Sequence, residues 1–85
     1  MFKIKAADGT NNLCGRRIAQ IRKAQRLSQR KLAERMQLLG FDVDHYFIRR
    51  VENGECFVTD IDLVIFSRAL KEPISSILNE KDAEL

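Results

Sequence analysis

Signals that start and stop short helices recur along this chain and constrain its fold more than any other feature. Ser28, Asp44 and Thr59 are residue types that cap the free amides at a helix N-terminus, and each precedes apolar residues at helical spacing. Two glycines follow these stretches: Gly40 suits a left-handed helix stop, and Gly54 with Asn53 is expected to end the helix before it. The pattern predicts an all-α domain, a compact bundle of about five short helices.

The apolar spacing also predicts where the helices lie and which side chains face inward. We expect helices from residue 12 or 13 to 26, over 28–39 and over 44–53, a fourth after Thr59, and a short fifth that begins at Pro73. The residues expected to face inward are Ile18, Ile21, Ala24, Leu32, Ala33, Met36, Ile48, Val51, Ile61, Val64, Ile65, Ala69, Leu70, Ile74, Ile77 and Leu78, with Phe47 as an alternative to Ile48.

The two ends of the chain are predicted to lie outside the helical domain. Phe2 and Ile4 alternate with polar residues before a polar cluster at 8–12, so we expect 1–12 to be an arm that is either loose or packed on the body. Residues 79–85 are predicted to be a polar tail that frays. The predicted helical domain therefore spans 13–78.

Length and composition exclude several classes of protein. Eighty-five residues suit one domain without a second, ligand-sensing one, and 45% hydrophobic with 32% charged residues is typical of a folded chain. No apolar run is long enough for a signal peptide or a membrane span. Cys14 and Cys56 are interpreted as free thiols, and with His45 they lack the spacing of a zinc site. We expect a soluble, cytoplasmic protein with no metal, cofactor, small-molecule ligand or membrane contact.

The charge is unevenly distributed along the chain. Residues 14–35 contain eight basic residues and one acidic residue, whereas 55–85 contain three basic and seven acidic ones. This asymmetry favours a polyanion bound on one side of the molecule. A solvated helical face produces the same pattern, so the charge alone leaves both interpretations open.

Three segments of the chain resemble one known family. They are IRKAQRLSQRKLAERM at 21–36, VDHYFIRRVENG at 43–54 and TDIDLVIFSRALKEPISSIL at 59–78. Together they resemble the lambda-repressor-like (Cro/cI, XRE-type) helix-turn-helix DNA-binding domains, in which a small residue such as Ala33 lets the second and third helices cross closely. Gln29 and Ile48 are 19 residues apart, against about 14 in the family, so about five residues at 37–41 are extra. We expect them to lengthen the second helix and its turn.

The resemblance implies that helix 44–53 enters the major groove of double-stranded DNA. His45, Tyr46 and Arg49 match positions that face base edges, and Arg is well suited to guanine. His45 as an exposed bystander and Tyr46 at the edge of the core remain open. The other residues predicted to contact DNA or to support such contacts are Ser28, Gln29, Arg30, Asp44, Arg50 and Asn53.

Two further roles concern the scaffold of this third helix. In the family an Arg of the first helix frequently pairs with the Glu of Glu-Asn-Gly, which here implies a bidentate pair of Arg22 and Glu52. Phe47 is expected to pack on the extended turn at 38–41 instead of contacting DNA.

The leading functional hypothesis is a prokaryotic or phage-borne, sequence-specific transcriptional regulator. It is expected to act as a repressor and to bind a two-fold operator as a homodimer. The dimer surface is expected among Phe57, Phe66, Ile74 and Ile77, with a core position as the alternative for each. A second hypothesis is a protein-interaction module or an antitoxin-like component with a protein partner. An enzyme is not expected, because the chain has one His and neither a glycine-rich phosphate loop nor a metal-ligand cluster.

Overall fold

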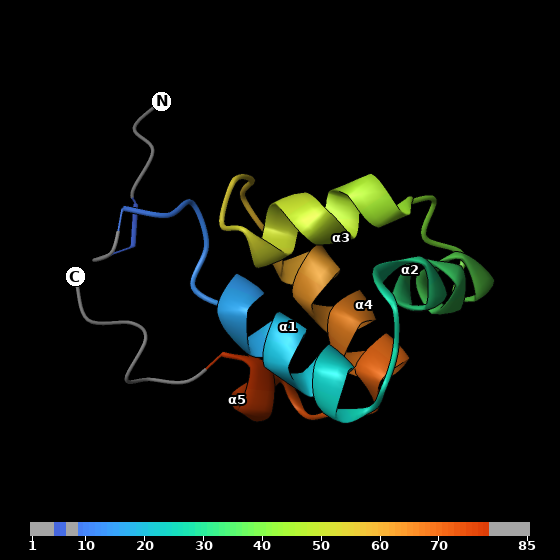
Figure 1. The fold of residues 1–85 in the computed structure, drawn as a ribbon. Coiled ribbons are helices and arrows are strands. Elements are labelled where there is room, and N and C mark those ends of the chain that lie inside the picture. Colours follow the sequence, from blue (N-terminus) through green and yellow to red (C-terminus); the bar gives the residue numbers. More distant parts are fainter. Residues whose placement is uncertain (1–4, 7–8, 79–85) are drawn as a thin grey trace.

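Five short helices make up the regular structure of the described part of this protein (Figure 1). The computed structural model describes residues 5–6 and 9–78. In this part of the chain, α3 packs across α1 and α2, and α4 packs against α1, α2 and α5, so the predicted all-α class is confirmed. The helices are α1 (Gly15–Ala24), α2 (Gln29–Leu38), α3 (His45–Glu52), α4 (Asp60–Leu70) and α5 (Ile74–Ile77). The arm residues Phe2 and Ile4 and the tail 79–85 lie outside the described residues.

Side-chain caps determine where three helices begin. Ser28 and Asp44 each accept a hydrogen bond at 3.0 Å from the backbone amide three residues further on. Thr59 accepts from the amide of Asp62 (3.0 Å), and the Asp62 carboxylate accepts from the amide of Thr59 (2.9 Å), which forms a capping box. Each bond satisfies an amide that the helix itself leaves unpaired. The three predicted caps are confirmed.

The first helix is shorter at both ends than predicted. It begins at Gly15 because the side chain of Asn12 accepts the Gly15 amide hydrogen at 2.8 Å, so Asn12 lies outside the helix. It ends at Ala24 because Gln25 leaves helical geometry and Arg26 has a left-handed φ of 58°. The left-handed stop predicted at Gly40 (φ 89°) is confirmed, and so is the helix end predicted at Asn53 and Gly54, where Gly54 is also left-handed (φ 73°).

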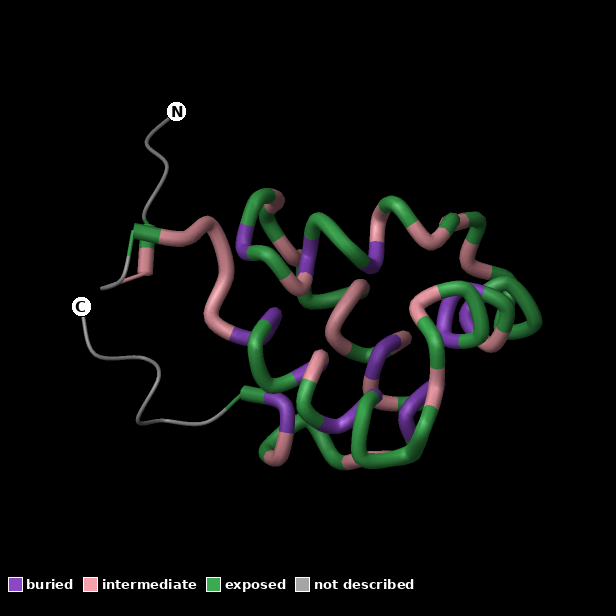
Figure 2. The backbone as a smooth tube through the Cα atoms, viewed as in Figure 1, coloured by how far each residue is buried: buried purple, intermediate pink, exposed green. Residues whose placement is uncertain are grey.

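One core joins all five helices (Figure 2). Phe66 of α4 is fully buried at its centre, and the ring of Phe47 stacks on it at a centroid distance of 6.0 Å. Burying each large apolar side chain contributes about 1.5–3 kcal/mol. The other large side chains that are fully buried are Ile18, Leu32, Met36, Ile48, Val51, Leu70 and Ile77.

The inward face of α4 differs from the prediction. Phe66, Ala69 and Leu70 are buried, whereas Ile61 is 65% exposed and Val64 is 36% exposed. The buried residues define one side of the helix, and the helical repeat places Ile61 and Val64 on the other side. The prediction that Ile61 and Val64 are core residues was wrong. Phe66, predicted as a dimer contact, is a core residue.

The ends of α1 and α5 also differ from the prediction. Ala24 is exposed, because the inner face of α1 is set by Ile18, Ile21 and Arg22. Helix α5 has four residues, and of the three apolar side chains expected to face inward only Ile77 is buried, whereas Ile74 and Leu78 are exposed. Ile77 therefore belongs to the core and not to a dimer surface.

The extra residues at 37–41 form the end of α2 and the start of the turn before α3. Leu38 is 87% exposed and Leu39 is also exposed, so neither supports Phe47 as expected. Phe41 does support it, with its ring centroid 6.4 Å from that of Phe47. Phe47 therefore packs between the turn and Phe66, and only part of its predicted environment is correct.

Candidate nucleic-acid interface

The exposed face of α3 and its C-cap carries four of the nine residues predicted to contact DNA. Ile48 and Val51 anchor the opposite face and are fully buried. Residues three, four and seven positions apart share one face of a helix, so the exposed residues form a single strip. This strip, called the α3 strip below, consists of Tyr46, Arg49, Arg50 and Asn53.

The other predicted residues of this helix lie at its N-terminal edge. His45 is half-buried, and its ring lies against that of Tyr46 with a centroid distance of 4.1 Å. Asp44 is exposed, and its carboxylate accepts the amide hydrogen of Phe47 as the N-cap. The structure therefore gives Asp44 a structural task as the N-cap of α3.

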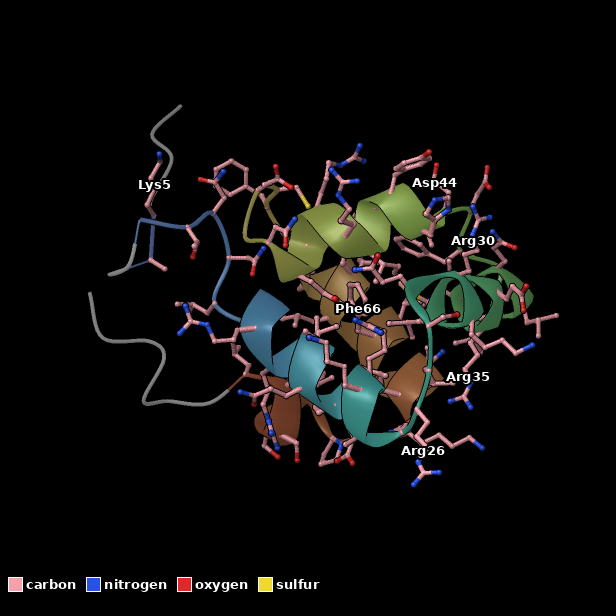
Figure 3. All side chains as sticks on the ribbon, in the orientation of Figure 1. Lys5, Arg26, Arg30, Arg35, Asp44 and Phe66 are labelled. Carbon is pink, nitrogen blue, oxygen red and sulfur yellow. The ribbon has the colours of Figure 1, made fainter. Side chains whose placement is uncertain are left out.

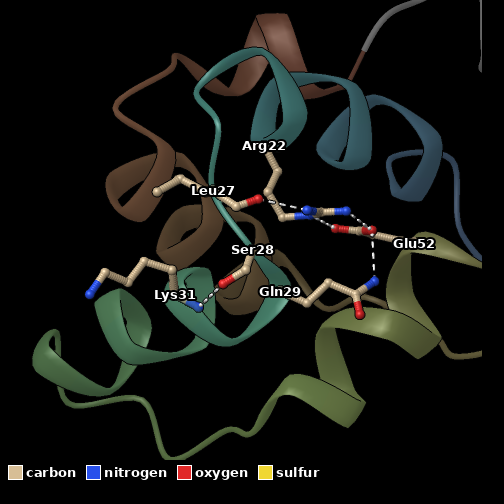
Figure 4. Close-up of polar contacts among 6 residues, drawn as sticks. All are labelled: Arg22, Leu27, Ser28, Gln29, Lys31 and Glu52. Atoms are coloured by element: carbon tan, nitrogen blue, oxygen red, sulfur yellow. Dashed lines mark hydrogen bonds and ion pairs between the residues drawn. The ribbon is translucent and has the colours of Figure 1, made fainter.

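A buried ion pair holds the C-terminal end of α3 against α1 (Figure 4). Arg22 donates to both oxygens of Glu52, from Nε to Oε2 at 2.6 Å and from Nη2 to Oε1 at 2.9 Å. Its Nη1 donates to the carbonyl of Leu27 at 2.7 Å. The side chains are only 10% and 5% exposed. The pair implied by the family resemblance is present, and both of its members are turned away from solvent.

The start of α2 contributes to this ion pair and to the surface. The side-chain amide of Gln29 donates to Glu52 Oε1 at 3.1 Å, so this predicted DNA contact also braces α3 (Figure 4). The hydroxyl of Ser28 is engaged as the helix cap. Arg30 is exposed and extends from α2 into solvent (Figure 3). The sequence prediction missed the bracing role of Gln29, for which the nearby Arg22 and Glu52 were the available signal.

A second junction at the end of α3 was not predicted. The side chain of Asn12 donates to the carbonyls of Val51 (3.1 Å) and Cys56 (2.9 Å) while it accepts from the amide of Gly15. A Cβ on Gly15 would lie 2.0 Å from the carbonyl oxygen of Val51, so α1 begins directly against the last turn of α3. Of the two possibilities for the arm, residues 10–12 are packed on the body.

Asn11 extends this junction into the loop that follows α3. Its amide donates to the carbonyl of Gly54 (2.9 Å), and its side chain donates to that of Glu55 (3.0 Å). Asn53 lies in the same turn, exposed, with its side-chain amide 3.5 Å from the Glu55 carboxylate. The adjacent asparagines before α1 were the signal for this contact, but their partners are about 40 residues away in the chain.

The basic residues of 14–35 do not all face the α3 strip. Arg17 donates to the carbonyl of Ser76 (2.8 Å), and Arg35 donates to that of Ala69 (3.1 Å), so both bind helix ends within the fold. Arg26 and Arg35 point away from α3 in Figure 3. Only part of the basic excess predicted to bind a polyanion therefore lies beside α3.

The two cysteines lie in the same region and are free thiols. Burial raises the pKa of Cys14 from 9.0 to about 11, and burial also raises the pKa of the half-buried Cys56. Both thiols are therefore uncharged at neutral pH, which disfavours metal binding and nucleophilic chemistry. The described residues contain no group of three or more His, Cys, Asp or Glu that could hold a metal ion. None of their helices has the length and apolarity to cross a membrane.

Comparison with known proteins finds a similar fold among the solved structures. No family model and no curated protein matches the chain. The chain is similar to the restriction-modification controller protein C.AhdI from Aeromonas hydrophila, with 26% sequence identity and a TM-score of 0.67. The match covers 78% of this chain and 92% of that chain. It confirms the helix-turn-helix fold and the resemblance to the lambda-repressor-like domains.

Proposed function

We propose that this protein is a sequence-specific DNA-binding transcriptional regulator that inserts α3 into the major groove. The α3 strip carries the proposal, because it presents two arginines and a tyrosine on a helix held from behind by buried contacts. In helix-turn-helix proteins the helix at this position lies in the groove. The similar solved structure is that of a restriction-modification controller protein, which supports the same class of function.

The residues of the α3 strip have different tasks in this proposal. Arg49 reads a guanine through two parallel hydrogen bonds, while His45 and Tyr46 contact a base or a thymine methyl at the N-terminal edge. Arg50 reaches the margin of the groove. Asn53 binds a phosphate together with the start of α2, where the backbone amides and the dipole of the helix favour an anion. The residues assigned to α2 are Ser28, Gln29 and Arg30.

The regulator is proposed to be a prokaryotic, cytoplasmic repressor that occupies a promoter as a homodimer. One helix of eight residues reaches only a few base pairs, so a single copy reads too little sequence for a unique site. Two copies on a two-fold operator double the number of bases read. Repression by occupancy requires no cofactor or small-molecule ligand.

Selection of bound sequences from a random double-stranded DNA pool tests this proposal. We expect a two-fold symmetric motif, and a pool without enrichment would refute sequence-specific binding. In the selected site, Arg49→Ala should cost about 1–3 kcal/mol and relax the preference at one base pair of each half-site. Asn53→Ala should weaken the binding of all DNA sequences equally. Lys23→Ala removes an exposed charge from α1 and is the matched control, for which we expect little change.

A protein-interaction module is the second candidate, and one observation favours it. Leu38 is 87% exposed at the end of α2 and is followed by the exposed Leu39. An apolar pair of this kind suits a protein partner better than a phosphate backbone. Binding measured across salt concentrations separates the candidates, because phosphate contacts give a linear fall of log affinity with log salt. A Leu38→Lys variant that no longer regulates its target although its DNA affinity is unchanged would favour the interaction module.

A further inference from the structure

The outer face of α4 carries large apolar side chains that the fold leaves uncovered. Ile61 is 65% exposed and Val64 is 36% exposed, one turn apart on the side of α4 opposite to Phe66. None of the residues proposed to contact DNA lies on this helix. The surface can therefore bind a partner while the α3 strip stays accessible.

The charges at the two ends of this surface are opposite. Asp60 and Arg68 are both exposed and lie four residues before and four residues after Val64. The Asp60 carboxylate accepts a hydrogen bond from the adjacent amide of Ile61 (2.8 Å). Among the described residues, neither this carboxylate nor the Arg68 guanidinium belongs to an ion pair. The face therefore runs from negative through apolar to positive along one helix.

Such a face is complementary to itself. A two-fold axis that passes through Val64 and relates two antiparallel copies of α4 brings position 60 of one copy opposite position 68 of the other, twice. Charged residues around an apolar centre are the usual arrangement of a specific interface. A DNA backbone on this face would meet the negative charge of Asp60 and the apolar side chain of Ile61, and both disfavour a phosphate partner.

We propose that two copies of this chain associate through antiparallel α4 helices, with Val64 near the two-fold axis and Asp60 of each copy paired with Arg68 of the other. Ile61 of each copy is then covered by the second helix. This interface deepens the proposed function, because it gives the homodimer a defined surface. It also takes the place of the dimer contacts predicted at Phe66 and Ile77, which are core residues.

The apolar part of the interface is tested by sedimentation velocity without DNA. The wild-type chain should dimerise in the micromolar range, and Ile61→Lys should raise the dimer dissociation constant roughly a hundredfold. Ala24→Lys is the matched control, since it also places a lysine at an exposed apolar position but on α1. A wild-type chain that stays monomeric, or equal effects of both substitutions, would overturn the proposal. Circular dichroism shows whether each variant is folded.

The charged part is tested by a pair of variants that should dimerise only with each other. Asp60→Arg and Arg68→Asp each place like charges opposite one another in a homodimer and should raise its dissociation constant about tenfold. In a mixture both contacts become Arg with Asp, so heterodimers should form with near wild-type affinity. Asp60→Arg mixed with Lys23→Asp is the control, because Lys23→Asp changes the charge equally but lies on α1. Equal recovery in both mixtures would refute the 60–68 pairing.

These measurements are independent of DNA and separate this proposal from the previous one. If the wild-type chain dimerises, Ile61→Lys prevents this, and the chain selects no DNA sequence, then the α4 interface is retained and the DNA-binding function is refuted. If the chain selects a two-fold motif and the α4 variants dimerise as tightly as the wild type, then the DNA-binding function is retained and the α4 interface is refuted.

Discussion

Removal of the Glu52 carboxylate is the most direct test of how α3 is held. Glu52→Ala deletes both hydrogen bonds from Arg22 and the one from Gln29, and the Arg22 guanidinium keeps only its bond to the Leu27 carbonyl. Because the Arg22 side chain is only 10% exposed, its charge is then left buried without a counter-ion. Breaking such a pair costs about 3–5 kcal/mol, more than the pair itself contributes.

This cost is large for a domain of 85 residues. The total free energy of unfolding for a chain of this length is about 4–13 kcal/mol. Each kcal/mol lost lowers the melting temperature of a small domain by about 4–8 °C. We therefore expect a decrease of at least about 12 °C for Glu52→Ala.

Thermal and urea unfolding of Glu52→Ala should be compared with Glu34→Ala. Glu34 also forms an ion pair, with Lys31 at 3.4 Å, but its side chain is 61% exposed. Its loss should cost less than about 1 kcal/mol. Similar melting temperatures for the two variants, or an unchanged melting temperature with altered DNA preference in Glu52→Ala, would refute the role of Glu52 as a brace.

Three further outcomes follow from contacts near the ends of α3. Gly15→Ala should destabilise the fold by about 1–3 kcal/mol in urea unfolding, because its Cβ would lie 2.0 Å from the Val51 carbonyl oxygen; stability equal to the wild type would show that the helices do not meet so closely. Asn12→Ala removes three hydrogen bonds and should lower the free energy of unfolding by about 1–3 kcal/mol. Asn53 is exposed, so Asn53→Ala should weaken DNA binding and leave stability nearly unchanged; the reverse result would contradict both assignments. Folded Cys14 keeps its proton up to a pKa of about 11 while the unfolded thiol loses it near 9.0, so the unfolding free energy should fall by about 2–3 kcal/mol as the pH rises between these values. A Cys14→Ala variant with the same pH dependence would exclude this thiol as the cause.

The sequence predicted the features that depend on neighbouring residues. The caps at Ser28, Asp44 and Thr59 bond amides three residues away, and the left-handed turn at Gly40 is a property of one residue. Such signals act within one turn of helix and are visible in a short stretch of sequence. The Arg22–Glu52 pair spans 30 residues and was predicted only through the family resemblance.

The features that were missed depend on packing between distant segments. Apolar residues lie on nearly all sides of α4, so the sequence does not show that Phe66 faces the core while Ile61 and Val64 face solvent. The three bonds of Asn12 connect α1 with residues 39 and 44 positions further along the chain. An isolated Asn carries no signal of its eventual partner.

The contacts at the two ends of α3 explain how the fold accepts the extra residues at 37–41. The C-terminal end is bound to α1 through Glu52 and to the N-terminal segment through the carbonyl of Val51, and neither contact involves the turn after α2. The N-terminal end depends on the Asp44 cap and on Phe47, whose ring packs on Phe41 of that turn. A longer turn therefore acts on the end that carries His45 and Tyr46. The end that carries Arg49 and Arg50 is held by α1 through Arg22 and by the start of α2 through Gln29, and both of these contacts lie away from the turn.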